Sequence, residues 1–164
     1  MDAREVGGLW LLREMWGFPA GVPEDERLEY LKLIMACARG DGVLSSREPD
    51  WVIGYGAACG AHQSTVDALA GYDGDEDVVA IVDRNLPAAA GWARVAVFDA
   101  IRACAADREY NGEEKQAVRR IAARLDRGED VVAALEAVHE AEQDVKARRV
   151  GLIFGDAVPY QDRA

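Results

Sequence analysis

Apolar residues recur at three- and four-residue spacing along most of the chain, and this helical period constrains the fold more than any other feature. Residues 28–38 are representative, because Leu28, Leu31 and Ile34 fall on one helical face. The apolar run at residues 78–82 has strand propensity, but acids precede it and Asp83-Arg84 follows it, which favours an amphipathic helix. The sequence therefore predicts an all-α, compact bundle of seven or eight helices.

The chain length predicts one domain. It has 164 residues and a mass of 17.8 kDa, and no linker or low-complexity segment divides it. We expect a single helical domain over residues 1–154 and a C-terminal tail over residues 155–164. Residues 150–154, Val-Gly-Leu-Ile-Phe, are too apolar to remain in solvent, so they are expected to dock on the core.

The charge balance argues against one class of partner. There are 19 basic and 30 acidic residues, which gives a formal net charge of −11. Nucleic-acid binding needs clustered Lys and Arg, and the doublets Arg119-Arg120 and Arg148-Arg149 are too short to form such a surface. No nucleic-acid partner is expected, whereas cations and basic protein surfaces suit an acidic chain.

The cysteines and the chain start bear on the cellular compartment. Cys37, Cys59 and Cys104 show no Cys-x-x-Cys spacing and lie among alanines, so we expect buried thiols and no disulfide. The first residues include Asp2 and Glu5 where a secretory signal would be basic, and no apolar run approaches a membrane span. The expected location is the cytoplasm.

Two stretches of the chain match each other, residues 36–48 and residues 102–114, at a constant offset of 66. Each copy ends a helix of small residues at an aspartate, places a capping residue four positions later, and a glutamate three positions beyond it. The matched residues are Asp41, Ser45 and Glu48 in the first copy, and Asp107, Asn111 and Glu114 in the second. The final spacing is that of a capping box. The chain is therefore predicted to contain a duplicated helical hairpin with pseudo-twofold symmetry.

The duplicated motif resembles the TerB-like family of tellurite-resistance proteins. The first copy, Ala-Arg-Gly-Asp-Gly-Val-Leu-Ser-Ser-Arg-Glu at residues 38–48, fits the family pattern closely, and the likeness spans roughly residues 28–145. The second copy departs from it at Arg108, where glycine is usual. The resemblance implies an all-α cytoplasmic protein without enzymatic activity, acting as an accessory or scaffold in tellurite, metal or chemical stress. It also implies a protein partner, and a homodimer remains open.

The repeated acids allow two interpretations. Asp41, Glu48, Asp107 and Glu114 can serve only as turn and cap residues. If the pseudo-twofold gathers them, their carboxylates form a hard oxygen site that suits Ca²⁺, Mg²⁺ or Mn²⁺, as is proposed for the family. An Arg108 guanidinium beside Asp107 would compete with a cation bound in the second copy.

Two other metal motifs are weaker. Asp73, Asp75 and Asp77 begin like a calcium loop, but Val78 replaces the turn glycine and Arg84 the bidentate glutamate.

Glu136 and His139 have the Glu-x-x-His spacing of di-metal carboxylate enzymes, which need a second such pair. The only other histidine, His62, follows Cys59 at that spacing rather than a glutamate. A small helical metalloenzyme using Glu136 and His139 is therefore the alternative function, with His139 expected on a solvated face.

No nucleophile triad or glycine-rich phosphate loop can be assembled from the sequence. Gly54 and Gly56 lie inside a helical pattern, where glycines are expected to permit close helix packing rather than to bind a nucleotide.

Overall fold

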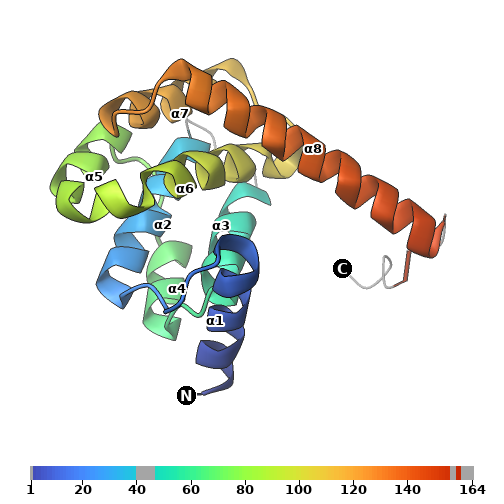
Figure 1. The fold of residues 1–164 in the computed structure, drawn as a ribbon. Coiled ribbons are helices and arrows are strands. Elements are labelled where there is room, and N and C mark those ends of the chain that lie inside the picture. Colours follow the sequence, from blue (N-terminus) through green and yellow to red (C-terminus); the bar gives the residue numbers. More distant parts are fainter. Residues whose placement is uncertain (1, 40–46, 156–157, 160–164) are drawn as a thin grey trace.

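The structure is a computed structural model that describes residues 2–39, 47–155 and 158–159, and leaves aside the side chains of residues 86–90. Within that part of the chain there are eight α-helices, one 3₁₀ helix and no strand (Figure 1). The helices are α1 (Ala3–Trp16), α2 (Glu24–Ala38), α3 (Arg47–Ala58), α4 (Gln63–Ala70), α5 (Val78–Arg84), α6 (Leu86–Cys104), η1 (Ala105–Asp107), α7 (Gly112–Arg124) and α8 (Glu129–Phe154). The all-α prediction is confirmed, including the assignment of residues 78–84 to a helix.

Local capping explains where several helices begin and end. At the start of α1, the Asp2 side chain accepts from the Glu5 amide at 2.9 Å, while Glu5 accepts from the Asp2 amide at 2.8 Å. Gly17 ends α1 in the left-handed conformation, at φ 68°, which glycine adopts without a steric penalty. Asp77 caps α5 by accepting from the Val79 and Ala80 amides.

The core forms between the two halves of the duplication. The predicted hairpins are α2 with α3 and α6 with α7, and α2 packs on α6 at the centre (Figure 1). Leu31 and Ile34 of α2 and Val97 and Ile101 of α6 are at most 2% exposed. Burying each such side chain contributes about 1.5–3 kcal/mol, so this central pair anchors the fold.

The two glycines of α3 behave differently. A Cβ atom at Gly56 would lie 2.6 Å from Leu31 Cδ1, so glycine there permits the close approach of α3 to α2, as predicted. A Cβ atom at Gly54 would meet nothing within 4 Å. The packing prediction is therefore wrong for Gly54, which faces away from neighbouring helices.

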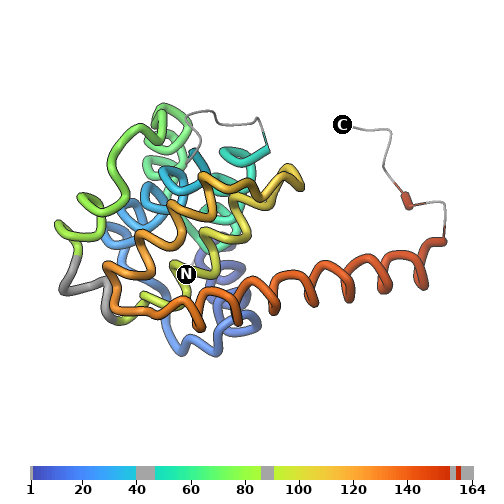
Figure 2. Tube along the Cα trace, turned by 90° about the horizontal axis from the view of Figure 1, so that it is seen from above, coloured from blue at the N-terminus to red at the C-terminus, as the bar shows by residue number. Residues whose placement is uncertain are grey.

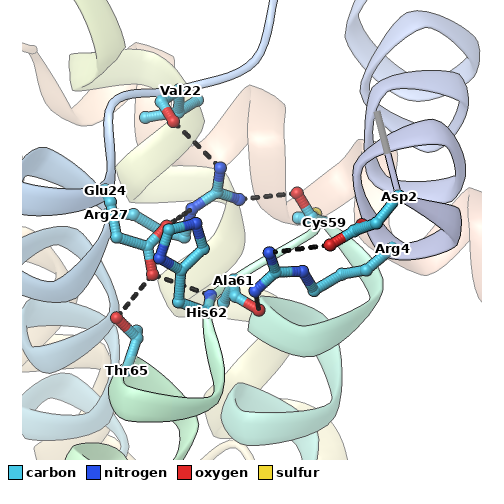
Figure 3. Close-up of polar contacts among 9 residues, drawn as sticks. All are labelled: Asp2, Arg4, Val22, Glu24, Arg27, Cys59, Ala61, His62 and Thr65. Atoms are coloured by element: carbon cyan, nitrogen blue, oxygen red, sulfur yellow. Dashed lines mark hydrogen bonds and ion pairs between the residues drawn. The ribbon is translucent and has the colours of Figure 1, made fainter.

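A buried arginine ties two loops together at the end of the bundle near α1 (Figure 3). Arg27 donates to the carbonyl oxygens of Cys59 and Val22 at 2.5 and 2.9 Å, and to the Glu24 carboxylate at 3.1 Å. Glu24 also accepts from the Thr65 hydroxyl at 2.6 Å. These charge-assisted bonds fix the loop before α2 against the loop after α3.

The end of α8 contradicts one prediction. Residues 150–154 were expected to dock on the core, but they continue α8, and Leu152 and Ile153 are 78% and 63% exposed. No helix breaker lies between residues 129 and 149, so the helix runs on for 26 residues, about 39 Å, and leaves the bundle (Figure 2). The division into a domain at 1–154 and a tail at 155–164 stays a prediction, since most of the tail lies outside the described residues. No helix in the described ranges is long and apolar enough to cross a membrane.

Candidate functional site

Three of the four predicted acids, Glu48, Asp107 and Glu114, lie beside the turns of the two hairpins. Asp41 lies outside the described residues, as does Ser45. Glu48 sits in the first turn of α3 and Glu114 is the third residue of α7, and each is 2% exposed. Asp107 ends η1, where its Oδ1 accepts from the Glu109 amide at 2.8 Å. At least one carboxylate oxygen of Asp107 therefore accepts a hydrogen bond from the backbone of the turn.

The capping box predicted in the second copy is confirmed. Asn111 Oδ1 accepts from the Glu113 and Glu114 amides, each at 3.0 Å, and Glu114 Oε2 accepts from the Asn111 amide at 2.8 Å. These bonds satisfy helix-end amides that otherwise lack partners. In the first copy the same spacing places Glu48 in the first turn of α3, but its capping partner Ser45 falls in the part of the chain that is not described.

The buried glutamates of the two hairpins both act on the pKa of one thiol, that of Cys104. Burial raises the pKa of Cys104 well above its usual range, and the nearby Cys37, Glu114 and Glu48 raise that pKa further. Burial likewise raises the pKa of Cys37 to about 12. All three cysteines are buried and free, as predicted, and burial keeps them in the protonated, unreactive form. The tertiary structure thus brings Glu48 and Glu114 to the same part of the core.

Glu48 and Glu114 are hard oxygen donors, the ligand type that suits Ca²⁺, Mg²⁺ or Mn²⁺. Among the described residues, however, no three His, Cys, Asp or Glu side chains come together in a group that could hold a metal ion. Completing a site at these turns therefore depends on Asp41.

Arg108 occupies the position where the family pattern usually has glycine. Its φ angle is 77°, in the left-handed region, and its side chain is exposed. For a residue with a Cβ atom, that conformation raises the free energy of the folded state by about 1–2 kcal/mol, and for glycine the increase is far smaller. The turn of the second hairpin therefore carries backbone strain at Arg108.

The two residues of the Glu-x-x-His pair of α8 have different surroundings. Glu136 Oε1 accepts from the Tyr110 hydroxyl at 3.0 Å and pairs with Arg119 at 3.6 Å. His139 is half-buried rather than on a solvated face, which corrects the prediction, and its Nδ1 is buried without a hydrogen-bond partner among the described residues. Burial lowers the pKa of His139, and the charge of Arg102 lowers it further.

His139 contributes to a cleft that the sequence analysis missed. This cleft, which we call the α8 cleft, has a volume of about 880 Å³ and lies between α8, the starts of α3 and η1, and the end of α1. Its cationic lining residues are Arg47, Arg102, Arg108, Lys146 and Arg149, and Glu142 is its acidic lining residue. Its larger apolar lining residues are Met15, Trp51, Val138 and Val145. The part of this surface that the sequence displays is the heptad spacing of Val138, Val145 and Leu152, which continues past Arg149.

A buried polar network supports one wall of this cleft. Arg102 pairs with Asp99 at 3.1 Å, and its guanidinium lies 5.1 Å from the centre of the Trp51 ring. Asp99 also accepts from the Tyr30 hydroxyl at 2.6 Å. Burial raises the pKa of Asp99, and the bonds from Tyr30 and Arg102 oppose that rise. Ion pairing and the ring contact hold Arg102 in place at the cleft wall.

Comparison with known proteins gives one informative result. No family model matches the sequence, and no curated protein does. The crystal structure of a tellurite resistance protein from Nostoc punctiforme superposes with a TM-score of 0.86 and 29% sequence identity, over 98% of this chain and 99% of that one. The likeness covers both hairpins and α8, so it confirms the resemblance first indicated by the duplicated motif.

Proposed function

Because this chain is TerB-like in fold and in sequence, we propose that it is a non-enzymatic accessory or scaffold protein of tellurite, metal or chemical stress response. The observation that carries the proposal is the match to a tellurite resistance protein over nearly the whole of both chains. It acts in the cytoplasm through a protein partner, either another protein or a second copy of itself.

The environments of the reactive side chains support a non-enzymatic role. The three thiols are buried, and burial raises their pKa values. Glu136, the acid of the metalloenzyme alternative, is already engaged by Tyr110 and Arg119. No observation therefore favours the metalloenzyme over the accessory role.

Growth under tellurite tests this function. Deleting the gene in its native host should lower the potassium tellurite concentration that permits growth, and a plasmid-borne copy should restore it. A plasmid encoding Ile34→Asp, which places a charge in the core, is the matched control and should not restore growth. If deletion leaves growth unchanged on tellurite, on peroxide and on metal salts, the stress-response role is wrong.

We extend the proposal to a divalent cation, Ca²⁺, Mg²⁺ or Mn²⁺, bound by Asp41, Glu48, Asp107 and Glu114. Support comes from the convergence of Glu48 and Glu114 on the same part of the core. A ligand that binds only the folded state stabilises it by about 2.7 kcal/mol at a hundredfold excess over Kd.

The melting temperature tests the cation site. CaCl₂ or MnCl₂ should raise the melting temperature more than NaCl at equal ionic strength, which controls for screening of the −11 charge. Asp41→Asn should remove most of that difference, because it deletes one anionic ligand and nearly keeps the side-chain shape. Equal responses of both proteins to both salts would show that the acids act only in turns and caps.

A further inference from the structure

We infer that the α8 cleft binds an acidic amphipathic helix of a protein partner. The inference deepens the proposed function, on which it rests, because it gives the chemistry of the partner that an accessory protein would engage. It is carried by the apolar stripe of α8, the cations beside that stripe, and the residues that hold some of these cations in place.

The apolar stripe is set by heptad spacing. Val138, Val145 and Leu152 are 48%, 62% and 78% exposed, and seven-residue spacing places them along one side of α8. From Val138 to Leu152 this stripe is about 21 Å long, which matches about four turns of a second helix. The C-terminal part of α8, which carries the far end of this stripe, extends away from the other helices (Figure 2).

Five cations line the cleft beside this stripe, and Arg102 is the one that pairs with a carboxylate among the described residues. The other four, Arg47, Arg108, Lys146 and Arg149, have no ion pair within the described part of the chain. Such a cluster on a protein of net charge −11 gives this face the opposite sign from the molecule as a whole.

Two cations of the cleft are held in position, one by a strained backbone and the other by contacts with neighbouring side chains. Arg108 extends from a backbone in the left-handed region, at φ 77°, where glycine would be less strained. Arg102 is held from beneath by the buried Asp99 and alongside by the Trp51 ring. The cleft therefore presents positive charge from a partly rigid wall, which lowers the entropy cost of binding.

The cleft has both apolar and cationic side chains, and this combination determines which kind of ligand fits it. A small anion would neutralise the cations and leave Val138, Val145 and Leu152 in water. An apolar helix would cover the stripe and leave the cations unpaired. A helix with apolar residues at heptad spacing and glutamates on its flanks satisfies both surfaces at once.

The first test uses a defined peptide. A fluorescein-labelled peptide of about 18 residues, with leucines at heptad spacing and glutamates on the flanks, should bind the full chain in fluorescence anisotropy. A matched peptide with lysine in place of glutamate should not bind, and neither should one with serine in place of leucine. Equal binding of the glutamate and lysine peptides would overturn the inference.

The second test uses two adjacent arginines of α8. Arg149 lines the cleft and Arg148 does not, although both are exposed. Arg149→Glu should weaken binding of the glutamate peptide about tenfold. Arg148→Glu makes the same charge change and should weaken it less than about twofold. Melting temperatures confirm that both variants are folded, and equal effects of the two substitutions would contradict the assignment of the cleft.

Sedimentation velocity separates a foreign partner from a second copy. The chain should remain monomeric at concentrations where the peptide binds. A dimer that Arg149→Glu dissociates and Arg148→Glu does not would assign the cleft to self-association and overturn the inference. The peptide assays use purified protein, whereas the stress-response role is measured by growth, so either can fail while the other succeeds.

Discussion

The hydroxyl of Tyr30 donates a 2.6 Å hydrogen bond to Asp99, a carboxyl with no exposure to solvent. The bond joins α2 to α6, the central helix pair, and Asp99 in turn holds Arg102 at the wall of the α8 cleft. A buried polar group is costly when a partner is removed, so this contact couples the stability of the core to the shape of the cleft.

Tyr30→Phe should lower the free energy of unfolding by about 1–3 kcal/mol, because it takes one donor from a buried carboxyl. Tyr110→Phe is the matched control. The acceptor of Tyr110, Glu136, is 22% exposed, so water can replace the lost donor and the loss should be smaller. Urea denaturation of both variants measures the free energy of unfolding. Equal decreases in the two variants would show that the burial of Asp99 does not strengthen the effect of losing the donor.

Arg108→Gly should raise the free energy of unfolding by about 0.5–1 kcal/mol, because glycine adopts the left-handed conformation without a Cβ clash. Arg108→Ala removes the same charge but keeps the Cβ atom, so it should give no such gain. Thermal melts at equal ionic strength compare the two variants. If alanine stabilises as much as glycine does, charge rather than backbone strain governs this position.

Gly54→Ala should stabilise the protein by about 0.5–1 kcal/mol, since alanine is the better helix former and the new methyl group meets nothing within 4 Å. Gly56→Ala in the same helix should instead destabilise it, because the methyl group would lie 2.6 Å from Leu31, which is only 2% exposed. Denaturation midpoints of the pair measure the effect of packing at equal helix propensity. A gain of equal size at both positions would contradict the close approach of α3 to α2.

The pKa of His139 should lie below its ordinary value of 6.5, because burial and Arg102 disfavour the charged ring more than Glu140 and Glu142 favour it. The unfolded chain then binds the proton more readily than the folded one. The contribution of the neutral His139 ring to the free energy of unfolding is therefore fully present above pH 6.5, and it is lost as the pH falls below that value.

Two measurements check this behaviour. NMR titration should show the His139 ring titrating below pH 6.5, its signal being identified by its loss in His139→Gln. Between pH 5 and 6.5 the free energy of unfolding should fall less steeply in His139→Gln than in His62→Gln, the control that removes the other histidine. Identical slopes in the two variants would rule out a buried neutral ring at residue 139.

Capping and periodicity act over a few residues, and this is why the sequence alone predicted the helices so closely. The spacing of Asn111 and Glu114 predicted a capping box, and each side chain bonds the other residue's amide. The acids around residues 78–82 favoured a helix over a strand, and α5 is there. The constant offset between the two copies predicted a pair of matching hairpins, and these correspond to α2–α3 and α6–α7.

What depends on distant contacts was decided by the tertiary structure. Apolarity predicted that residues 150–154 dock, but an unbroken α8 carries Leu152 and Ile153 beyond the bundle. The α8 cleft draws its cations from α3, α6, the turn after η1 and α8, so no local pattern reveals that these cations lie together. Helix ends and faces follow from interactions between residues three or four apart, which a sequence displays. That Arg102 and Arg149 line the same cleft follows from the packing angles of whole helices, which are set by the sum of all core contacts.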